Sequence, residues 1–327
     1  MSGLSSDAAW SAIEREKDGS NSYDLTSDIA AEKLQDQIRD RTVLITGVTP
    51  GSLGADAARV IAVHAPKLLI LAGRSEQPLQ ETIATVKKTC SSTVSIKPLM
   101  VDLGSQSSVR AAASELLKLT SVVDVLINSA GLMMIPAFTK TPEGIEMHFG
   151  VNHIGHFLLT NLIMPVLLKS PSPCVVNVSS AAHRSSPVRF DDYNFEDGKT
   201  YEPFLGYAQS KCANLLFTVS LSQKLGSKGL VAFGVDPGGS ITNLFYRWAD
   251  EDGQPSAALK ARSKTVPQAV ASYIVAAFDP NIKDRSGAVI CAADIDDSTP
   301  DHAKNPDLAE KLWKLSEKLV GQQFTYI

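Results

Sequence analysis

The sequence predicts an α/β protein: a single doubly wound, Rossmann-like domain on a mostly parallel sheet of seven strands. Short apolar segments rich in β-branched residues alternate with longer segments of helical spacing throughout residues 42–292. The first of these strands, Arg41–Thr46, runs into a glycine-rich loop and then a helix, an order typical of nucleotide-binding sheets. No Gly/Ser-rich linker interrupts the alternation, which favours one domain over two.

The loop after the first strand predicts a phosphate site. Backbone N–H groups and the N-terminus of the helix that follows, from Ala55 to His64, would hold a pyrophosphate, and glycine leaves room for it to approach. We assign cofactor contacts to six residues of this loop: Gly47, Thr49, Gly51, Ser52, Leu53 and Gly54.

The second strand, Lys67–Leu71, is followed by an arginine that indicates which nicotinamide cofactor binds. An NAD site usually has an acid near this strand end, for the ribose 2′-hydroxyl. Arg74 stands there instead, and a guanidinium suits a phosphate better than a neutral hydroxyl. The alternative is a solvated surface arginine. We expect NADP(H) rather than NAD(H).

Two further strands end in residues that suit the ligand-binding edge of a parallel sheet. One is Leu99–Leu103, which contains Asp102, and the other is Val122–Ile127, which leads into Asn128. Asp102 could equally cap the helix that starts near Ser105, and Asn128 could bond the neighbouring backbone.

Tyr207 and Lys211 stand four residues apart and share one face of a predicted helix. Ser179 and Ser180 close a Val-Val-Asn-Val strand upstream. A free tyrosine titrates near pH ~10, and a nearby ammonium would lower the pKa of Tyr207. A phenol, an ammonium and a hydroxyl together could protonate a carbonyl while a cofactor delivers hydride. Tyr-x-x-x-Lys alone also fits an ordinary helix face.

Seven motifs in order make residues 41–294 resemble a short-chain dehydrogenase/reductase. They are Thr46-Gly47…Gly51…Gly54, Asp102-Leu103, Asn128-Ser129-Ala130-Gly131, Asn152, Val176–Ser180, Tyr207-x-x-x-Lys211 and Pro237-Gly238. Within the family, Val151–Phe157 and Ser210–Asn214 resemble the retinol-dehydrogenase-like reductases.

The resemblance implies a role for each matching residue. Tyr207 would be the general acid in reduction and the base in oxidation, Lys211 would hold the nicotinamide ribose and lower the Tyr207 pKa, and Ser180 would bind the substrate oxygen. Asn152 would anchor a water that links Lys211 to solvent. The remaining cofactor contacts would come from Arg74 at the adenosine phosphate, Asp102 and Leu103 at the adenine, Asn128, Ala130 and Gly131 along the groove, and Pro237, Gly238, Ser240 and Thr242 at the carboxamide.

The chain departs from the family pattern in its glycine-rich loop. Two residues separate Gly51 from Gly54, so the loop is one residue longer than usual, and Pro50 supplies no N–H. Which glycine meets the pyrophosphate is left open. Ser129 also stands where many members have asparagine.

Composition argues against several other classes of protein. The net charge of −4 with mixed signs shows no nucleic-acid footprint, and no apolar run is long enough to span a membrane. The four cysteines form no Cys-x-x-Cys pair, and the first residues lack the features of a secretory signal. These features favour a cytoplasmic location. The histidines near the motifs, His153, His156 and His183, lack further ligands at metal-site spacing, so we expect no metal.

We expect two terminal segments around the domain of residues 41–294. Residues 1–40 are a polar extension with a helix from Asp28 to Arg39, and residues 295–327 supply a helix, Asn305–Leu319, and a tail that pack on the domain. A homodimer through residues 143–169 and 207–224 is one expectation, and burial of those helices against the N-terminal segment is the other.

Apolar residues beside the motifs predict a bulky apolar substrate. A lid over residues 240–260 and two neighbouring segments supply them: Ile241, Leu244, Phe245, Tyr246 and Trp248, with Leu132–Ile135, Phe204 and Leu205. The expected function is NADP(H)-dependent interconversion of a carbonyl and an alcohol. The alternatives are an epimerase or other net non-redox reaction at the same site, and an NADPH-sensing binding protein.

Overall fold

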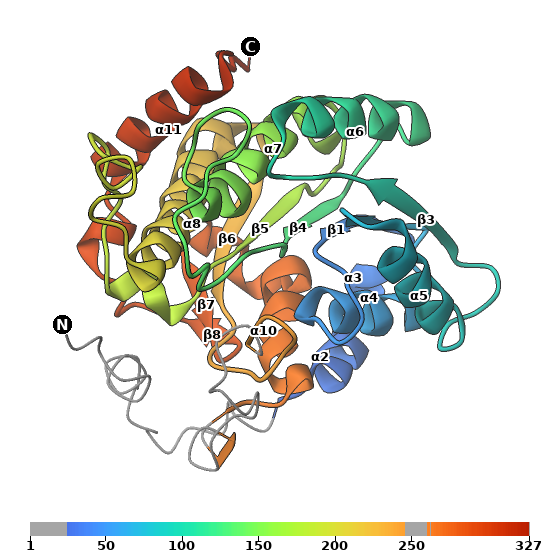
Figure 1. Ribbon diagram of the computed structural model, residues 1–327. Coiled ribbons are helices and arrows are strands. Elements are labelled where there is room, and N and C mark those ends of the chain that lie inside the picture. The colour runs from blue at the N-terminus through green and yellow to red at the C-terminus, as the bar shows by residue number, and fades with distance from the viewer. Residues whose placement is uncertain (1–24, 246–259, 262, 327) are drawn as a thin grey trace.

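The computed structural model describes residues 25–245, 260–261 and 263–326 (Figure 1). The strands in these residues are β1 Thr42–Thr46, β2 Leu68–Gly73, β3 Ser95–Met100, β4 Val125–Asn128, β5 Cys174–Val178, β6 Val231–Asp236, β7 Val289–Cys291 and β8 Asp294–Ile295. They form one sheet in the order β3-β2-β1-β4-β5-β6-β7-β8. All neighbours pair in parallel except β7 and β8. The predicted α/β fold with a mostly parallel sheet is confirmed.

The eighth strand lies beyond the seven that we expected. It returns from β7 through Ala292 and Ala293, whose φ angles are 52° and 61°. Two central residues with positive φ are the mark of a tight hairpin turn, which usually shows itself in sequence as Asn-Gly or Asp-Gly. An Ala-Ala turn carries no such signal.

Helices cover both faces of the sheet (Figure 1). The helices are α2 Ser27–Lys33, α3 Gln35–Ile38, α4 Leu53–Val63, α5 Glu76–Lys87, α6 Gln106–Leu119, α7 Gly155–Leu167, α8 Pro203–Leu225, α10 Val266–Phe278 and α11 Pro306–Val320, with the π-helix η2 Phe149–Ile154 and the short 3-10 helices η3 Ala181–Arg184, η4 Gly226–Lys228, η6 Pro280–Arg285 and η7 Asp301–Ala303. One apolar core joins α6, α7, α8 and α11 to the sheet, and a second joins α2, α4, α5 and α10 to the opposite face.

The central strand β1 contributes side chains to both apolar cores. Leu44 packs on the α7 side, whereas Val43 and Ile45 pack on the α4 side, and all three are fully buried. A strand covered on both faces needs apolar residues at successive positions, which explains the unbroken run from Val43 to Ile45.

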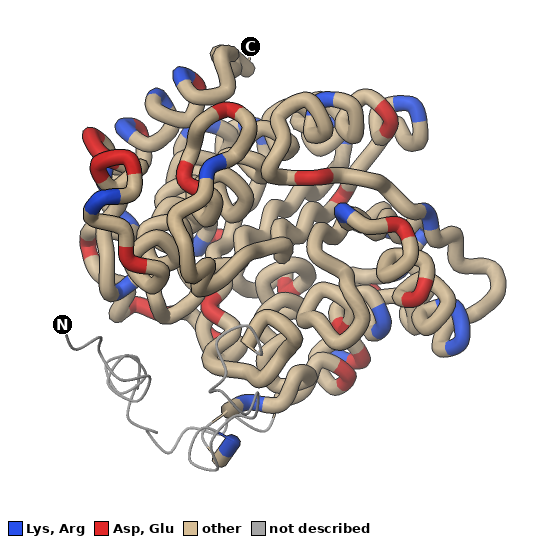
Figure 2. Tube along the Cα trace, viewed as in Figure 1, with Lys and Arg blue, Asp and Glu red and all other residues tan. Residues whose placement is uncertain are grey.

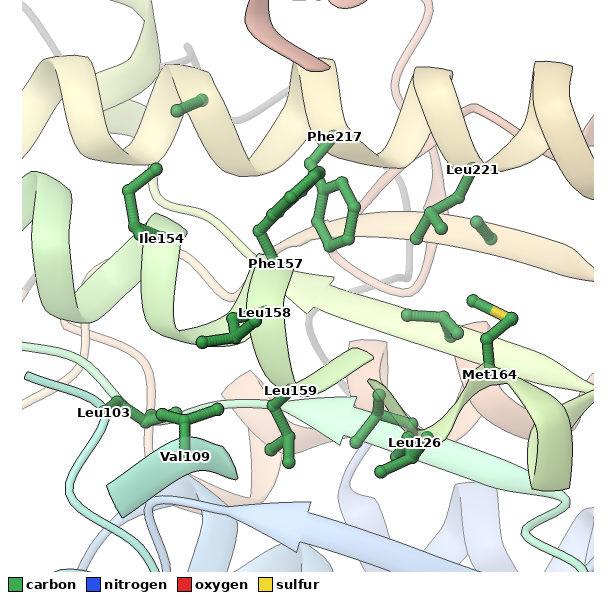
Figure 3. Packing of buried hydrophobic residues seen from close by; sticks show 14 of the residues in the cluster. Leu103, Val109, Leu126, Ile154, Phe157, Leu158, Leu159, Met164, Phe217 and Leu221 are labelled. Carbon is green, nitrogen blue, oxygen red and sulfur yellow. The ribbon is translucent and has the colours of Figure 1, made fainter. Parts of the chain in front are cut away.

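The C-terminal helix α11 completes the core around α7 and α8. Phe157 of α7 and Phe217 of α8 face each other with ring centroids 5.4 Å apart (Figure 3). Trp313 of α11 packs edge-on against Phe157 at 5.0 Å, and Phe324 of the tail packs against the same ring at 5.7 Å. Part of the surface of α7 and α8 is therefore covered by the chain's own C-terminal segment.

The described N-terminal residues pack elsewhere. The helix expected from Asp28 to Arg39 is divided into α2 and α3, and α2 lies against α4 and α10. Arg59 of α4 holds Asp28 through two hydrogen bonds of 2.8 and 2.9 Å, and its Nε bonds Asp56. The described part of the N-terminal segment therefore packs on α4 and α10 and not on α7 and α8, and residues 1–24 of that segment lie outside the described residues.

Lys and Arg are interspersed with Asp and Glu along the described parts of the chain (Figure 2). Among the residues that the structure describes, no helix is long and apolar enough to cross a membrane.

Candidate active site

A cavity of about 360 Å³ opens at the carboxyl ends of the central strands. This edge is where parallel α/β sheets bind ligands, because loops from neighbouring strands diverge there. The structure brings most of the predicted site residues to its walls: Gly47, Thr49, Ser52, Leu53, Arg74, Asp102, Leu103, Ala130, Gly131, Ser180, Tyr207, Lys211, Pro237, Gly238, Ser240 and Thr242. Four others, Gly51, Gly54, Asn128 and Asn152, do not line it.

At two glycines of the loop between β1 and α4, neighbouring backbone leaves no room for a side chain. Gly47 has a φ of +76°, and a Cβ there would lie 2.5 Å from the Cα of Ala130. A Cβ on Gly54 would lie 2.7 Å from the carbonyl oxygen of Gly47. Gly54 thus permits close packing of α4 on the loop, whereas Gly51 is exposed at its tip.

The N-terminus of α4 is held toward the cavity by Ser52. Its hydroxyl accepts a hydrogen bond from the N–H of Ala55 and donates one to Gly47, at 3.1 and 2.9 Å. Free N–H groups at such a helix start attract anions. The arrangement can therefore bind a pyrophosphate through the backbone of the loop.

Asn128 lies at the end of β4, buried beneath the cavity. Its amide nitrogen donates to the side chains of Thr160 and Asn177, at 3.1 and 2.9 Å. The alternative that it bonds neighbouring backbone is therefore also wrong, because its partners are side chains of α7 and β5.

Asp102 and Arg74 stand at the far end of the cavity, where strands β3 and β2 end. Asp102 accepts a hydrogen bond from the N–H of Gly104, at 2.9 Å. The cap of α6 is Ser105, not Asp102, since the Ser105 hydroxyl accepts from the N–H of Ser108. Arg74 is exposed and lines the cavity, so its guanidinium is available to an anion there.

Tyr207, Ser180 and Lys211 come together on the wall of the cavity. The Tyr207 hydroxyl lies near enough to the Ser180 hydroxyl for Ser180 to influence its pKa, and the Lys211 ammonium lies 5.6 Å from the centre of the Tyr207 ring. Lys211 also donates to the carbonyl of Val178 at 3.0 Å. Tyr207 and Lys211 lie one turn apart on α8, as expected, and both are buried.

Burial dominates the titration of this group. It raises the pKa of Tyr207 to about 12, although the Ser180 hydroxyl offsets part of the rise. It also lowers the pKa of Lys211 to about 8, which the carboxylate of Asp236 opposes. The expectation that Lys211 lowers the Tyr207 pKa is therefore wrong for the protein's own groups, because desolvation of the phenolate outweighs the nearby ammonium.

Asn152 sits in the π-helix η2, behind the cavity wall. Its side-chain oxygen accepts from the N–H of Leu132 at 2.7 Å, and its amide nitrogen donates to the carbonyl of Leu132 and the hydroxyl of Ser210, each at 2.9 Å. A Cβ on Gly131 would lie 3.3 Å from the Asn152 oxygen and 3.4 Å from the Lys211 ammonium. Asn152 thus fixes the loop that faces Lys211.

Sequence reasoning missed residues that reach the site from distant segments. Tyr273 of α10 lines the cavity, and its hydroxyl lies 3.1 Å from that of Ser129. His148, paired with the buried Glu146, accepts from the N–H of Ile135 at 3.2 Å. These side chains belong to no local motif, so no spacing in the sequence pointed to them.

The remaining wall of the cavity is apolar. It is formed by Leu132, Met133, Met134, Phe204, Leu244 and Phe245. Of the residues expected there, Ile135, Leu205 and Ile241 do not line the cavity, and Tyr246 and Trp248 lie outside the described residues.

The histidines near the motifs are held by structural hydrogen bonds. His153 bonds Ser316 of α11, His156 bonds Thr46, and His183 bonds the carbonyl of Ser180. His183 does not line the cavity. Within the described ranges, no group of three His, Cys, Asp or Glu side chains is placed to hold a metal ion.

The fold and the site define an α/β protein with a nucleotide-type cavity and a buried tyrosine–lysine–serine group. The family model described as short chain dehydrogenase matches residues 41–194. The chain is 36% identical over 316 residues to the short-chain dehydrogenase TIC 32 A, chloroplastic, of Brassica napus, covering 92% of this chain and 93% of that protein. It is 35% identical over 300 residues to retinol dehydrogenase 12 of Mus musculus, covering 88% and 89%.

A solved structure gives the same result. A putative uncharacterized protein from Mycobacterium paratuberculosis matches with a TM-score of 0.64 and 32% identity, over 93% of this chain and 98% of that chain. The chain belongs to the short-chain dehydrogenase family and is an oxidoreductase of that family. Its retinol dehydrogenase relatives confirm the resemblance inferred from the motifs.

Proposed function

We propose that the protein interconverts a carbonyl and an alcohol on a bulky apolar substrate, with NADP(H) as cofactor and Tyr207 as the general acid and base. The observation that carries the proposal is the convergence of Tyr207, Ser180 and Lys211 beside an apolar wall in one cavity. Relatives named retinol dehydrogenase fit such a substrate.

The residues present fit a dinucleotide. Backbone N–H groups of the Gly47–Gly54 loop and α4 would hold the pyrophosphate, and Asp102 would reach the adenine. Exposed Arg74 at the end of β2 would pair with a 2′-phosphate, which supports NADP(H) over NAD(H). Gly131, beneath the Lys211 ammonium, would leave room for the nicotinamide ribose.

In the direction of reduction, Tyr207 would donate its proton to the carbonyl oxygen while Ser180 donates a hydrogen bond to the same atom. The bound cofactor would supply the hydride. Lys211, charged below a pH of about 8, would stabilise the negative charge left on the Tyr207 oxygen. The apolar wall would exclude water from the reacting carbonyl.

The catalytic group also separates the alternatives. An NADPH sensor has no need of the buried Tyr207–Ser180–Lys211 group, which disfavours that reading. An epimerase would use the same residues, and it would convert substrate without net consumption of NADPH.

Location and assembly belong to the proposal as well. A cytoplasmic location is retained, and a plastid is the alternative that the chloroplastic relative suggests. Imaging of a fluorescent fusion separates the two. A homodimer remains a prediction, which sedimentation velocity measures.

The test is loss of NADPH absorbance with a panel of apolar aldehydes and ketones. We expect turnover in the wild type and a loss of several orders of magnitude in Tyr207→Phe. NADPH affinity, measured by cofactor fluorescence, should stay largely unchanged because the ring remains. A Tyr207→Phe variant with a near-normal rate would remove Tyr207 from the mechanism.

A further inference from the structure

A buried hydrogen-bond network joins the end of β1 to the π-helix that carries Asn152. The hydroxyl oxygen of Thr46 accepts from the backbone N–H groups of Ser129 and Ala130, each at 3.0 Å. The same oxygen lies 2.9 Å from Nε2 of His156. Because a hydroxyl has two lone pairs and one hydrogen, its own O–H must point to Nε2.

This assignment fixes the proton on the other nitrogen of the imidazole. Nε2 accepts, so the hydrogen of neutral His156 must sit on Nδ1, which lies 2.9 Å from the carbonyl oxygen of Asn152 and donates to it. His156 is only 2% exposed, and every polar atom of its ring has a partner. Burial and the Lys211 ammonium both lower its pKa, to about 4, which keeps the ring neutral at physiological pH.

The two ends of the network meet the same stretch of the cavity wall. From one side, Thr46 holds the N–H groups of Ser129 and Ala130. From the other side, the Asn152 side chain holds both backbone groups of Leu132. Gly131 lies between them, packed against the Asn152 oxygen and the Lys211 ammonium. The His156 ring contacts both Thr46 and the backbone of Asn152, and therefore links the two sides of this loop.

We propose that His156 is a positioning residue that holds Asn152 and the loop 129–132 in register with Lys211 and the end of β1. It touches neither substrate nor cofactor, and acts through Thr46 and Asn152. The inference rests on the proposed function, since its kinetic consequence appears in the carbonyl reduction.

Three variants separate the two contacts of the ring. In His156→Asn, the amide nitrogen stands near the position of Nδ1 and keeps the bond to Asn152. In His156→Gln, the longer amide reaches the Nε2 position and keeps only the contact with Thr46. His156→Leu keeps neither.

We expect all three variants to lose about 10- to 100-fold in kcat, the range seen when supporting contacts of a site are removed, because each of them breaks the link between Thr46 and Asn152. NADPH dissociation constants should change only a few-fold in all three, because the Gly47–Gly54 loop is untouched. His153→Leu is the matched control: it removes a buried histidine three residues away, and should lower the melting temperature without this kcat pattern.

A wild-type kcat in either the Asn or the Gln variant would overturn the proposal, as would a folded Leu variant with the wild-type rate. If the Leu variant does not fold, the Asn and Gln pair still decides. A wild-type protein without turnover on any carbonyl would instead refute the proposed function. In that case, ¹⁵N chemical shifts of His156 still test the network: a hydrogen on Nδ1 supports it, and a hydrogen on Nε2 refutes it.

Discussion

Replacing His153 with phenylalanine should make the protein less sensitive to acid. The imidazole of His153 is fully buried in an aromatic cage, with the ring centre of Phe149 5.3 Å away and that of Phe217 5.8 Å away. Its Nε2 bonds the Ser316 hydroxyl at 2.8 Å, while Nδ1 has no partner. Desolvation therefore lowers the pKa of His153 from 6.5 to about 3.

The sign and size of the effect follow from proton linkage. Between pH 7 and pH 5 the unfolded chain takes up a proton at this histidine, whereas the native chain, with its lower pKa, does not. The unfolded state binds more protons, so stability falls as the pH falls. The His153 contribution to this loss between pH 7 and pH 5 is about 2 kcal/mol.

Urea unfolding of the wild type and His153→Phe at both pH values measures this contribution. The expected result is a pH-dependent loss about 2 kcal/mol smaller in the variant, whatever its stability at pH 7. Ser316→Ala is the control, because it removes the same hydrogen bond but leaves the titrating ring, and should keep the wild-type loss. Equal losses in wild type and His153→Phe would refute the assignment of a buried, uncharged His153.

Three other changes test separate parts of the structure. Because the Lys211 pKa is lowered to about 8, kcat/KM for NADPH should fall as the pH rises through about 8. Lys211→Arg should move that fall to higher pH, and pH–rate profiles of the wild type and the variant measure the shift. Arg74→Glu should weaken NADPH binding roughly 10- to 100-fold while leaving NADH binding nearly unchanged, since it removes a charge-assisted contact only with the 2′-phosphate. Titrations of the wild type and the variant with each cofactor measure both affinities. Trp313→Ala should lower the free energy of unfolding by about 3–5 kcal/mol, because it opens a cavity between α7, α8 and α11; denaturant titration checks it.

The features that could be predicted from the sequence depend on residues that are contiguous or regularly spaced along the chain. The glycine loop, the apolar run of β1 and the Tyr207–Lys211 spacing each report a local geometry, and the structure places them as those patterns indicate. The helix at 305–319 was predicted from its apolar spacing and is found as α11.

What the sequence could not predict depends on segments far apart in the chain. Tyr273 reaches Ser129 across 144 positions, and the His153 ring meets Ser316 across 163. Neither pair has a local pattern, since each side chain alone looks like part of an ordinary buried helix. Burial is another property that the sequence does not show: the Tyr207–Lys211 spacing is visible in it, whereas the desolvation that raises the Tyr207 pKa is not.

The same burial bears on the direction of the proposed reaction. With a pKa of about 12, ionising Tyr207 at pH 7 costs about 7 kcal/mol, so the protein's own groups hold the phenol in its protonated form. Reduction of a carbonyl needs that form, and Tyr207 enters the reaction ready to donate. Oxidation of an alcohol needs the phenolate, which the Asp236 carboxylate disfavours because it raises the Tyr207 pKa further. The positive charge of an oxidised nicotinamide beside the phenol would have to provide the difference. Near neutral pH the described residues therefore hold Tyr207 in the protonated form, which is the form that donates in carbonyl reduction.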